Sequence, residues 1–432
     1  MGADGQEPVA VTDREELIYL LAEASELEHM LCCSYLFAAF SLKKDVAEDL
    51  TPSEHDAVKR WKHVITGVAI QEMLHLALAS NLLTSLGAAP HFRRPNFPQR
   101  SKYYPPTLQL TLRGFDEHTL DHFIFIERPE GMEFPDAPEF ASSVATATAP
   151  VADGIEPHDV PFESVAQLYR DIEQGFKSLC ERYGEEKVFI GPARAQATSA
   201  YFPFAELTAV TNLASALKVI ELIVEQGEGL RGDIENSHYA RFLAIRGELD
   251  RLRAGRPGFE PARPVLENPH TQPPPDATGF NLIDNPEARR ASDLFNASYG
   301  LMLELLMRFF AHTEETNDEL HALATTAVGV MRGVLDPLGS ILTSLPATTA
   351  GDSPRAGASF AFYRSIDYLP HRDAAWHVFS ERLAEITALS ENLGLEKVHA
   401  TLQGLESNLS RFIDAQGGRV RPHPPSTLPG PS

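Results

Sequence analysis

Glutamate residues interrupt the apolar stripes of several long amphipathic segments, and this feature constrains the fold most. In the segment from about 52 to 86, residues spaced three or four apart share one helical face: Ile65, Val68, Glu72, His75, Ala79, Leu82 and Leu86. An unpaired carboxylate on a buried face costs several kcal/mol. A chain with this pattern must fold into a helical bundle that also neutralises charge in its interior.

Two further segments repeat the pattern. In the segment from 13 to about 42, Glu28 takes an interior position of the stripe formed by Leu17, Leu21, Ala24, Glu28, Leu31, Tyr35 and Ala38. The segment from about 164 to 183 places Glu173 between Tyr169 and Phe176. The sequence leaves open whether Glu173 points inward. A competing apolar stripe would turn it outward, and that stripe consists of Leu168, Ile172 and Leu179.

The fourth segment, from about 204 to 227, carries several acids near its end. Glu221, Glu225 and Glu228 are each spaced to reach the interior face, and the sequence leaves open which of them does so. In the segment from 52 to 86, His75 lies three residues after Glu72. No histidine lies three residues after any of the three acids of the fourth segment. His238, at the start of the next helical segment (about 236 to 253), is the nearest residue for the missing imidazole.

Inward carboxylates together with a Glu-x-x-His pair match a two-metal site in a four-helix bundle. Carboxylate and imidazole ligands suit iron or manganese. We therefore predict two iron ions, or one iron and one manganese, which would offset the buried negative charge. The candidate ligands are Glu28, Glu72, His75, Glu173, one acid of the fourth segment, and His238.

Several short motifs lie on or beside these stripes. They are Leu27-Glu28-His29, the string from Glu72 to Ala77 with Asn81 and Gly87, the turn from Ile126 to Glu130, Tyr169, the string from Val224 to Gly229, and His238-Tyr239 with Arg241 and Phe242. Over about residues 12 to 250, the chain resembles the ferritin-like domain family related to the iminophenyl-pyruvate dimer synthase of bisindole biosynthesis. The resemblance implies a ferritin-type bundle, bound iron, and a role in secondary metabolism in which amino-acid-derived imines are coupled or oxidised. By matching motif positions, the resemblance also implies the metal-ligand candidates, which are Glu28, Glu72, His75, Glu173, Glu225 and His238.

Helical periodicity dominates the rest of the chain, and strand patterns are few, so we predict an all-α fold. The expected architecture is a ferritin-like four-helix bundle with long Pro-rich loops (12–255), a linker (256–286), an additional C-terminal helical region (287–418) and a disordered tail (419–432). The loops at 88–106 and 128–161 are predicted to border the substrate entrance. Arg93, Arg94 and Arg100 lie in the first loop, where they either bind a substrate carboxylate or form an ordinary surface loop.

The charge of the chain excludes some partners. The 60 Asp and Glu residues against 37 Lys and Arg give a net charge of −23, which repels phosphate backbones and anionic membranes. We therefore expect no nucleic acid and no membrane as partners. The 3 cysteines form no disulfide framework, and the N-terminus lacks a secretion signal, so a cytoplasmic location is expected.

Two functions remain after these exclusions. The first is a non-haem di-metal oxidase or oxygenase whose partners are dioxygen and a small amino-acid-derived metabolite. The second is a metal-free helical scaffold in which the buried acids are hydrogen-bonded or protonated. In that case the chain would serve as a partner subunit in a larger biosynthetic complex. Under either function, a homo-oligomer or a biosynthetic partner enzyme is a further expectation.

Overall fold

Helices make up nearly all regular structure in the part of the chain that can be described. The computed structural model describes residues 11, 13–100, 109–129, 131–132, 134–138, 140, 164–229, 234–272, 281–312, 314–362, 371–391 and 393–415. The predicted tail at 419–432 and most of the loop at 128–161 lie outside these residues. Four strands of two residues each pair as β1 with β2 and β3 with β4: β1 (Gln99–Arg100), β2 (Gln109–Leu110), β3 (Pro269–His270) and β4 (Asn281–Leu282). The predicted all-α fold is confirmed.

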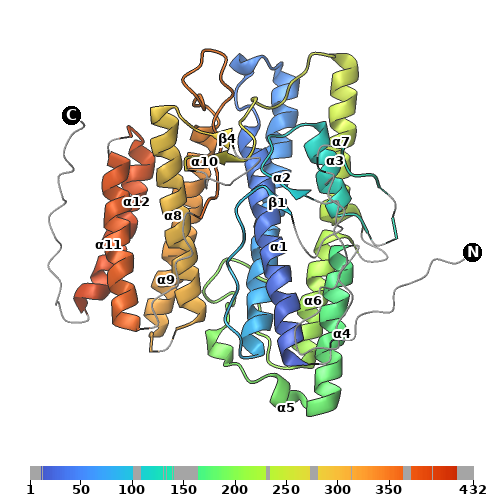
Figure 1. Cartoon of the computed structure of the whole chain (residues 1–432), viewed down its shortest axis with the longest axis vertical. Coiled ribbons are helices and arrows are strands. Elements are labelled where there is room, and N and C mark those ends of the chain that lie inside the picture. Colours follow the sequence, from blue (N-terminus) through green and yellow to red (C-terminus); the bar gives the residue numbers. More distant parts are fainter. Residues whose placement is uncertain are drawn as a thin grey trace, which may run out of the picture.

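The first half of the bundle is a pair of unbroken helices, α1 (Arg14–Ser41) and α2 (Pro52–Ser85). Asp13 caps α1, and Thr51 forms a capping box at the start of α2. The pair is antiparallel, since Arg14 at the start of α1 donates a hydrogen bond of 2.8 Å to the carbonyl of Leu86 just after α2. Figure 1 shows the two helices side by side along the whole bundle.

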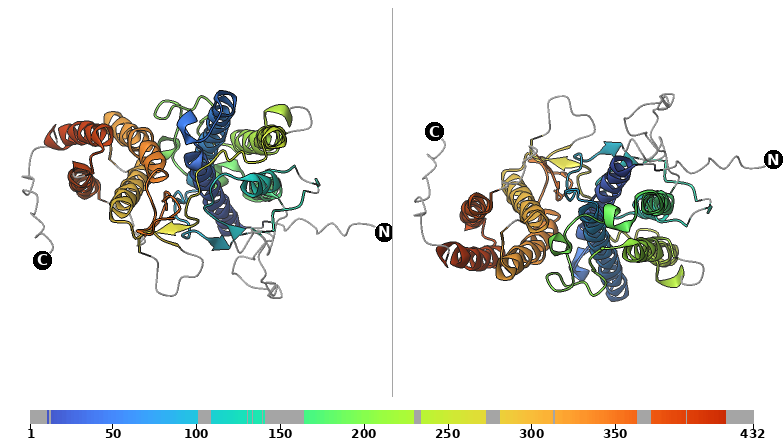
Figure 2. Two further views of the ribbon diagram at one scale, coloured as in Figure 1. Left: turned by 90° about the horizontal axis from the view of Figure 1, so that it is seen from above. Right: turned by 90° about the horizontal axis from the view of Figure 1, so that it is seen from below.

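The second half consists of two interrupted helices. α3 (Glu117–Ile126) lies in line with α4 (Val165–Tyr183), and α7 (His238–Gly255) lies in line with α6 (Leu213–Gly227), as the views in Figures 1 and 2 agree. α3 packs against α7, and α4 packs against α6. α2 ends at one end of the bundle and α3 begins at the other (Figure 1), so a long crossover joins them.

The start of α6 differs from the prediction, because the helix begins at Leu213 and not near Phe204. Two buried amide side chains hold the preceding segment in a loop. Asn81 donates to the carbonyl of Thr208 at 2.9 Å, and Gln196 forms bonds of 2.8 and 2.6 Å with the backbone of Val210. The helix then starts at the Asn212 cap. The remaining short helices are η1 (Val46–Glu48), α5 (Glu185–Val188), η2 (Ala193–Ala195) and η3 (Ile234–Asn236).

The C-terminal helices lie on one side of the bundle (Figure 1). They are α8 (Pro286–Phe310), α9 (Asn317–Val330), the π-helix η4 (Met331–Leu335), α10 (Asp336–Leu342), α11 (Arg372–Glu391) and α12 (Glu396–Ala415). α10 packs against α1, and α11 and α12 form an outer layer on α8 and α9. Gly339 allows α10 to approach α1, since a Cβ atom there would lie 2.2 Å from the ring of Phe40. Apolar side chains of the bundle and of this region form one continuous buried cluster, which includes Phe259 and Ile283 of the proposed linker. The division into domains stays a prediction.

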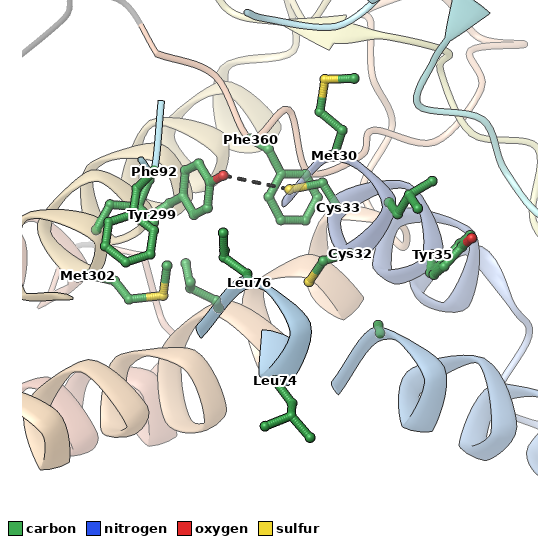
Figure 3. Packing of buried hydrophobic residues seen from close by; sticks show 14 of the residues in the cluster. Met30, Cys32, Cys33, Tyr35, Leu74, Leu76, Phe92, Tyr299, Met302 and Phe360 are labelled. Atoms are coloured by element: carbon green, nitrogen blue, oxygen red, sulfur yellow. Dashed lines mark hydrogen bonds between the residues drawn. The ribbon is translucent and has the colours of Figure 1, made fainter. Parts of the chain in front are cut away.

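The arginine cluster predicted between 88 and 106 contributes to this junction. Arg94 is buried and donates hydrogen bonds to Tyr299 Oη at 3.1 Å and to the carbonyl of Phe360 at 2.5 Å. Figure 3 shows Tyr299 beside Cys33 of α1, with 3.6 Å between the hydroxyl and the thiol. The prediction of an ordinary surface position is therefore wrong for Arg94, because its guanidinium ties the loop after α2 to α8.

No helix among the described residues is both long and apolar enough to cross a membrane.

Candidate metal centre

Five titratable side chains meet in the middle of the bundle, and each is at most 4% exposed: Glu28, Glu72, His75, Glu127 and His238. They form two groups of three that share one residue. The first triad is Glu28, Glu72 and His75, and the second triad is Glu72, Glu127 and His238. Within each triad the potential ligand atoms all lie within 4.8 Å of one another.

The first triad comes from the two unbroken helices. His75 lies one helical turn after Glu72, and its Nδ1 is 2.8 Å from Glu72 Oε2 and 3.5 Å from Glu28 Oε2. The other ring nitrogen, Nε2, lies 3.0 Å from the amide oxygen of Gln226 at the end of α6. An Nε2–H that donates to Gln226 leaves Nδ1 free to bind a metal ion, which is how outer groups orient a ligating imidazole. Tyr169 donates to the remaining oxygen of Glu28 at 2.6 Å.

The second triad depends on the interruptions of the other two helices. Glu127 is the residue directly after α3, and His238 is the first residue of α7. His238 Nδ1 lies 3.0 Å from Glu72 Oε1 and 3.5 Å from Glu127 Oε2. Tyr35 donates to the other oxygen of Glu127 at 2.5 Å. Each outer glutamate thus has one oxygen held by a tyrosine and one oxygen directed at a histidine.

Burial and mutual charge shift the ionisation of this site. Burial raises the pKa of Glu28 to about 7, although its hydrogen bond to His75 acts the other way. Burial also disfavours the charge of Glu72, but the adjacent imidazoles of His238 and His75 hold its pKa well below the usual value. Burial opposes protonation of His238 as well, yet Glu72 and Glu127 raise its pKa to about 9. The carboxylates therefore require positive charge beside them, either as protons on the histidines or as metal ions.

The donor set fits two divalent metal ions. Glu72 Oε1 and His238 Nδ1 are buried and lie 3.0 Å from each other, and His238 Nε2 is buried with no hydrogen-bond partner among the described residues. A buried polar atom without a partner is rare and costly, and a buried carboxylate oxygen that faces an imidazole nitrogen offers two atoms that an ion can bind. Three carboxylates with two imidazoles are the ligands that iron and manganese accept, and Glu72 offers one oxygen to each triad.

The structure brings together four of the six predicted ligands: Glu28, Glu72, His75 and His238. The inward position predicted for Glu173 is wrong, because the competing stripe of α4 is the buried one and Glu173 pairs with Lys177 at the surface. The inward position predicted for Glu225 is wrong as well, since its side chain is exposed.

The two alternatives on the same helix do not reach the site either. Glu221 is exposed, and the buried Glu228 accepts a hydrogen bond of 2.9 Å from the backbone of Ala166 at the start of α4.

Glu127 was not predicted as a ligand. It belongs to the turn motif that ends a helix of only ten residues, so no stripe of several turns marks it as inward-facing. The only signal in the sequence is a glutamate that directly follows the apolar run from Phe123 to Ile126. Helix ends direct side chains through the local backbone and not through periodicity, and stripe analysis does not detect them.

A family model described as Ferritin-like matches residues 21–247, which is more than half of the chain. This chain belongs to the Ferritin-like family. The five site residues lie at 28, 72, 75, 127 and 238, all within the matched region of this ferritin-like chain.

Two curated relatives match most of this ferritin-like chain. Dichlorochromopyrrolate synthase of Lentzea aerocolonigenes is 27% identical over 418 residues, covering 89% of this chain and 40% of its own length. The 2-imino-3-(indol-3-yl)propanoate dimerase of Chromobacterium violaceum is 25% identical over 371 residues, covering 80% of this chain and 34% of its own length. Both relatives confirm the resemblance to the iminophenyl-pyruvate dimer synthase family, although the chain spans less than half of either.

Among solved structures, a ferritin-like protein from Caulobacter vibrioides is 18% identical with a TM-score of 0.46. The match covers 72% of this chain and 94% of that chain.

Proposed function

We propose that this ferritin-like chain is a di-metal oxidase or oxygenase of the di-iron type that acts on a small amino-acid-derived metabolite in secondary metabolism. The observation that carries the proposal is the sharing of Glu72 by two triads, each of which has its own outer glutamate and its own histidine. Glu28, Glu72 and His75 would hold one ion, and Glu72, Glu127 and His238 would hold the other. Bound iron would supply the activation of dioxygen and the redox capacity of the reaction.

The chain's own residues provide position and shielding. Tyr35 and Tyr169 each hold one oxygen of an outer glutamate, so the other oxygen would be available to a bound ion. The site residues are almost completely buried, and this excludes water from reactive species. Each triad offers three donors, which leaves coordination positions for dioxygen and for substrate.

The names of the relatives support the substrate class. The dimerase from Chromobacterium violaceum is named for an imino acid that bears an indole ring. By analogy, the proposed substrate is an amino-acid-derived compound of similar size. The dimerisation step is not carried over, because the chain covers 34% of that relative's length.

The test is the metal content of the purified chain after growth with added iron. We expect about two ions per parent chain, as in other carboxylate-bridged bundles, and almost none in Glu72→Ala, because both triads lose their shared ligand. Glu173→Ala is the matched control, since this glutamate pairs with Lys177 away from the site and its loss leaves the metal content unchanged. A parent chain that binds no metal under these conditions contradicts the proposal.

One observation favours the metal-free scaffold as the second candidate. Protonated His75 and His238 lie 2.8 and 3.0 Å from Glu72, so protons alone can balance part of the buried charge. In this case Glu72→Ala lowers the stability of a chain that contains no metal. The same measurement of metal content therefore separates the two functions.

A further inference from the structure

A pocket lies at the junction of the bundle and the C-terminal region. Its volume is about 660 Å³, which falls in the range of small-molecule sites. Three parts of the chain line it, namely the loop after α1, the segment after α7 and the loop after α10. None of the five residues of the candidate metal centre is among its lining residues. The pocket is therefore separate from that centre.

Backbone hydrogen bonds hold these three parts together. The segment 261–266 lies between the other two and bonds to each of them. The N–H of Arg263 donates to the carbonyl of Ser41 at 2.9 Å, and the N–H of Arg355 donates to the carbonyl of Pro264 at 2.7 Å. The walls of the pocket are thus fixed before any ligand binds, which lowers the entropic cost of binding.

The pocket is positively charged, although the chain has a net charge of −23. Lys43, Arg263 and Arg355 line it together with one carboxylate, Glu48. Glu48 neutralises Arg263, because its two oxygens each lie 2.6 Å from a guanidinium nitrogen. Neither Lys43 nor Arg355 has a carboxylate partner among the described residues, and Asp352 of the same loop does not line the pocket. Two positive charges therefore remain uncompensated.

Further lysines beside the pocket add to its positive potential. Partial burial lowers the pKa of Lys44 to about 8, and the charges of Lys62 and Arg263 act in the same direction. Asp336 and Glu48 oppose this shift without cancelling it. An anion in the pocket would relieve the repulsion among these cations.

We propose that this pocket binds a small organic phosphate monoester. A phosphate monoester carries roughly −1.5 to −2 charges at neutral pH and three acceptor oxygens on one group, whereas a carboxylate carries a single charge. Arg355 would contact it through the planar fork of its guanidinium and Lys43 as a point charge. The volume exceeds that of a phosphate group, and the neutral walls, which include Pro264 and Pro346, leave space for an organic part. The proposal does not depend on the metal centre.

The experiment is a calorimetric titration of the full chain at low salt with phenyl phosphate, phenyl sulfate and succinate. The phosphate and the sulfate share a shape and differ in charge, and succinate places its charges on two separate groups. We expect phenyl phosphate to bind at least about tenfold more tightly than either of the others, and to weaken as salt is added. Equal binding of phenyl sulfate or of succinate overturns the assignment of a phosphate monoester.

Variants of the two uncompensated cations locate the binding position. We expect Lys43→Gln and Arg355→Gln each to bind phenyl phosphate about threefold more weakly, and the double variant to lose the preference over phenyl sulfate. The side chain of Lys43 makes no hydrogen bond among the described residues, so the fold does not depend on its charge. Lys397→Gln removes the same charge from the exposed face of α12 and is the control.

Metal content separates this pocket from the metal centre. We expect all of these variants to keep the metal content of the parent chain, because none of them changes a residue of either triad. Parent-like binding of phenyl phosphate by the folded double variant overturns the proposed pocket. Loss of phenyl phosphate binding together with loss of metal overturns it as well, since the phosphate would then bind at the metal centre.

Discussion

The two halves of the bundle supply the residues of the candidate site in different ways. α1 and α2 are unbroken helices of 28 and 34 residues, and they present Glu28, Glu72 and His75 from their middle turns. The other half is interrupted at the level of the site, and it presents Glu127 and His238 from helix ends. A ligand in mid-helix is fixed by the packing of many turns, whereas a ligand at a helix end depends on caps and local contacts. The unbroken half therefore provides the rigid reference, which includes the shared Glu72.

Among the variants that compare the two halves, the largest expected effect comes from removing the outer glutamate of one half. Glu28→Ala deletes a ligand of the first triad only, and Glu127→Ala deletes a ligand of the second triad only. We expect each variant to fall from about two bound ions to about one, because structural metal sites need their full ligand set. Metal analysis after gel filtration measures this directly. Loss of both ions in either variant would show that the triads do not bind independently.

The same contrast explains what the sequence could predict. Glu28, Glu72 and His75 lie on apolar stripes that run for many turns, so periodicity alone identifies their direction. Glu173 shows the limit of that argument, because α4 has two competing stripes and burial of Leu168 and Ile172 decides between them. Glu127 lies beyond the last turn of a short helix, where no periodicity exists.

Long-range contacts decided the remaining features of the interrupted half. The start of α6 depends on the side chain of Gln196, 14 residues before Val210, and on that of Asn81, 127 residues before Thr208. His238 was predicted as the nearest imidazole and by the family resemblance, and its contact with Glu72 requires α7 to lie in line with α6. The sequence therefore predicts the helices and the unbroken half of the site, while the interrupted half requires tertiary structure.

The next effect is a pH dependence of metal binding. The pKa of His238 is raised to about 9, so the metal-free chain holds a proton there at neutral pH. A metal ion must displace this proton, and the apparent affinity should rise up to about tenfold per pH unit until the pH reaches the pKa of His238. Calorimetry in buffers of different ionisation enthalpy measures the released protons. Affinity that stays constant from neutral pH to the pKa of His238 would contradict the expectation.

In the metal-free chain, the stability of the fold depends on pH in the opposite direction, and it falls as the pH rises. A raised pKa means that the folded state binds the proton more tightly than the unfolded state, whose histidine titrates near 6.5. The stabilisation from His238 is therefore fully present below that value and is lost as the pH rises through about 9. Urea unfolding at several pH values measures this loss of stability. The variant His238→Gln should remove this part of the pH dependence of the unfolding free energy.

A smaller effect is expected from the two tyrosines, which link the halves. Tyr35 of α1 holds Glu127 of the interrupted half, and Tyr169 of α4 holds Glu28 of the unbroken half. Removal of such an outer contact costs roughly 10- to 100-fold in metal affinity. We expect Tyr35→Phe to show the larger loss, because Glu127 at a helix end has fewer other constraints than Glu28. Metal titration measures both variants, with the exposed Tyr19→Phe as the control. A larger loss of metal affinity in Tyr169→Phe would show that the unbroken half holds its outer glutamate less rigidly than the interrupted half does.

The smallest expected effect separates fold stability from site geometry. Thr51 caps α2 far from the site, and Ser237 caps α7 directly before His238 by accepting a hydrogen bond of 3.2 Å from the backbone of Ala240. Loss of either cap should cost about 1 kcal/mol of unfolding free energy. Only Ser237→Ala should also weaken metal binding, because the loosened first turn of α7 carries His238. Urea unfolding and metal titration of both variants test this pair. Equal metal affinity in the two variants would show that His238 is fixed by its neighbours and not by the helix that begins with it.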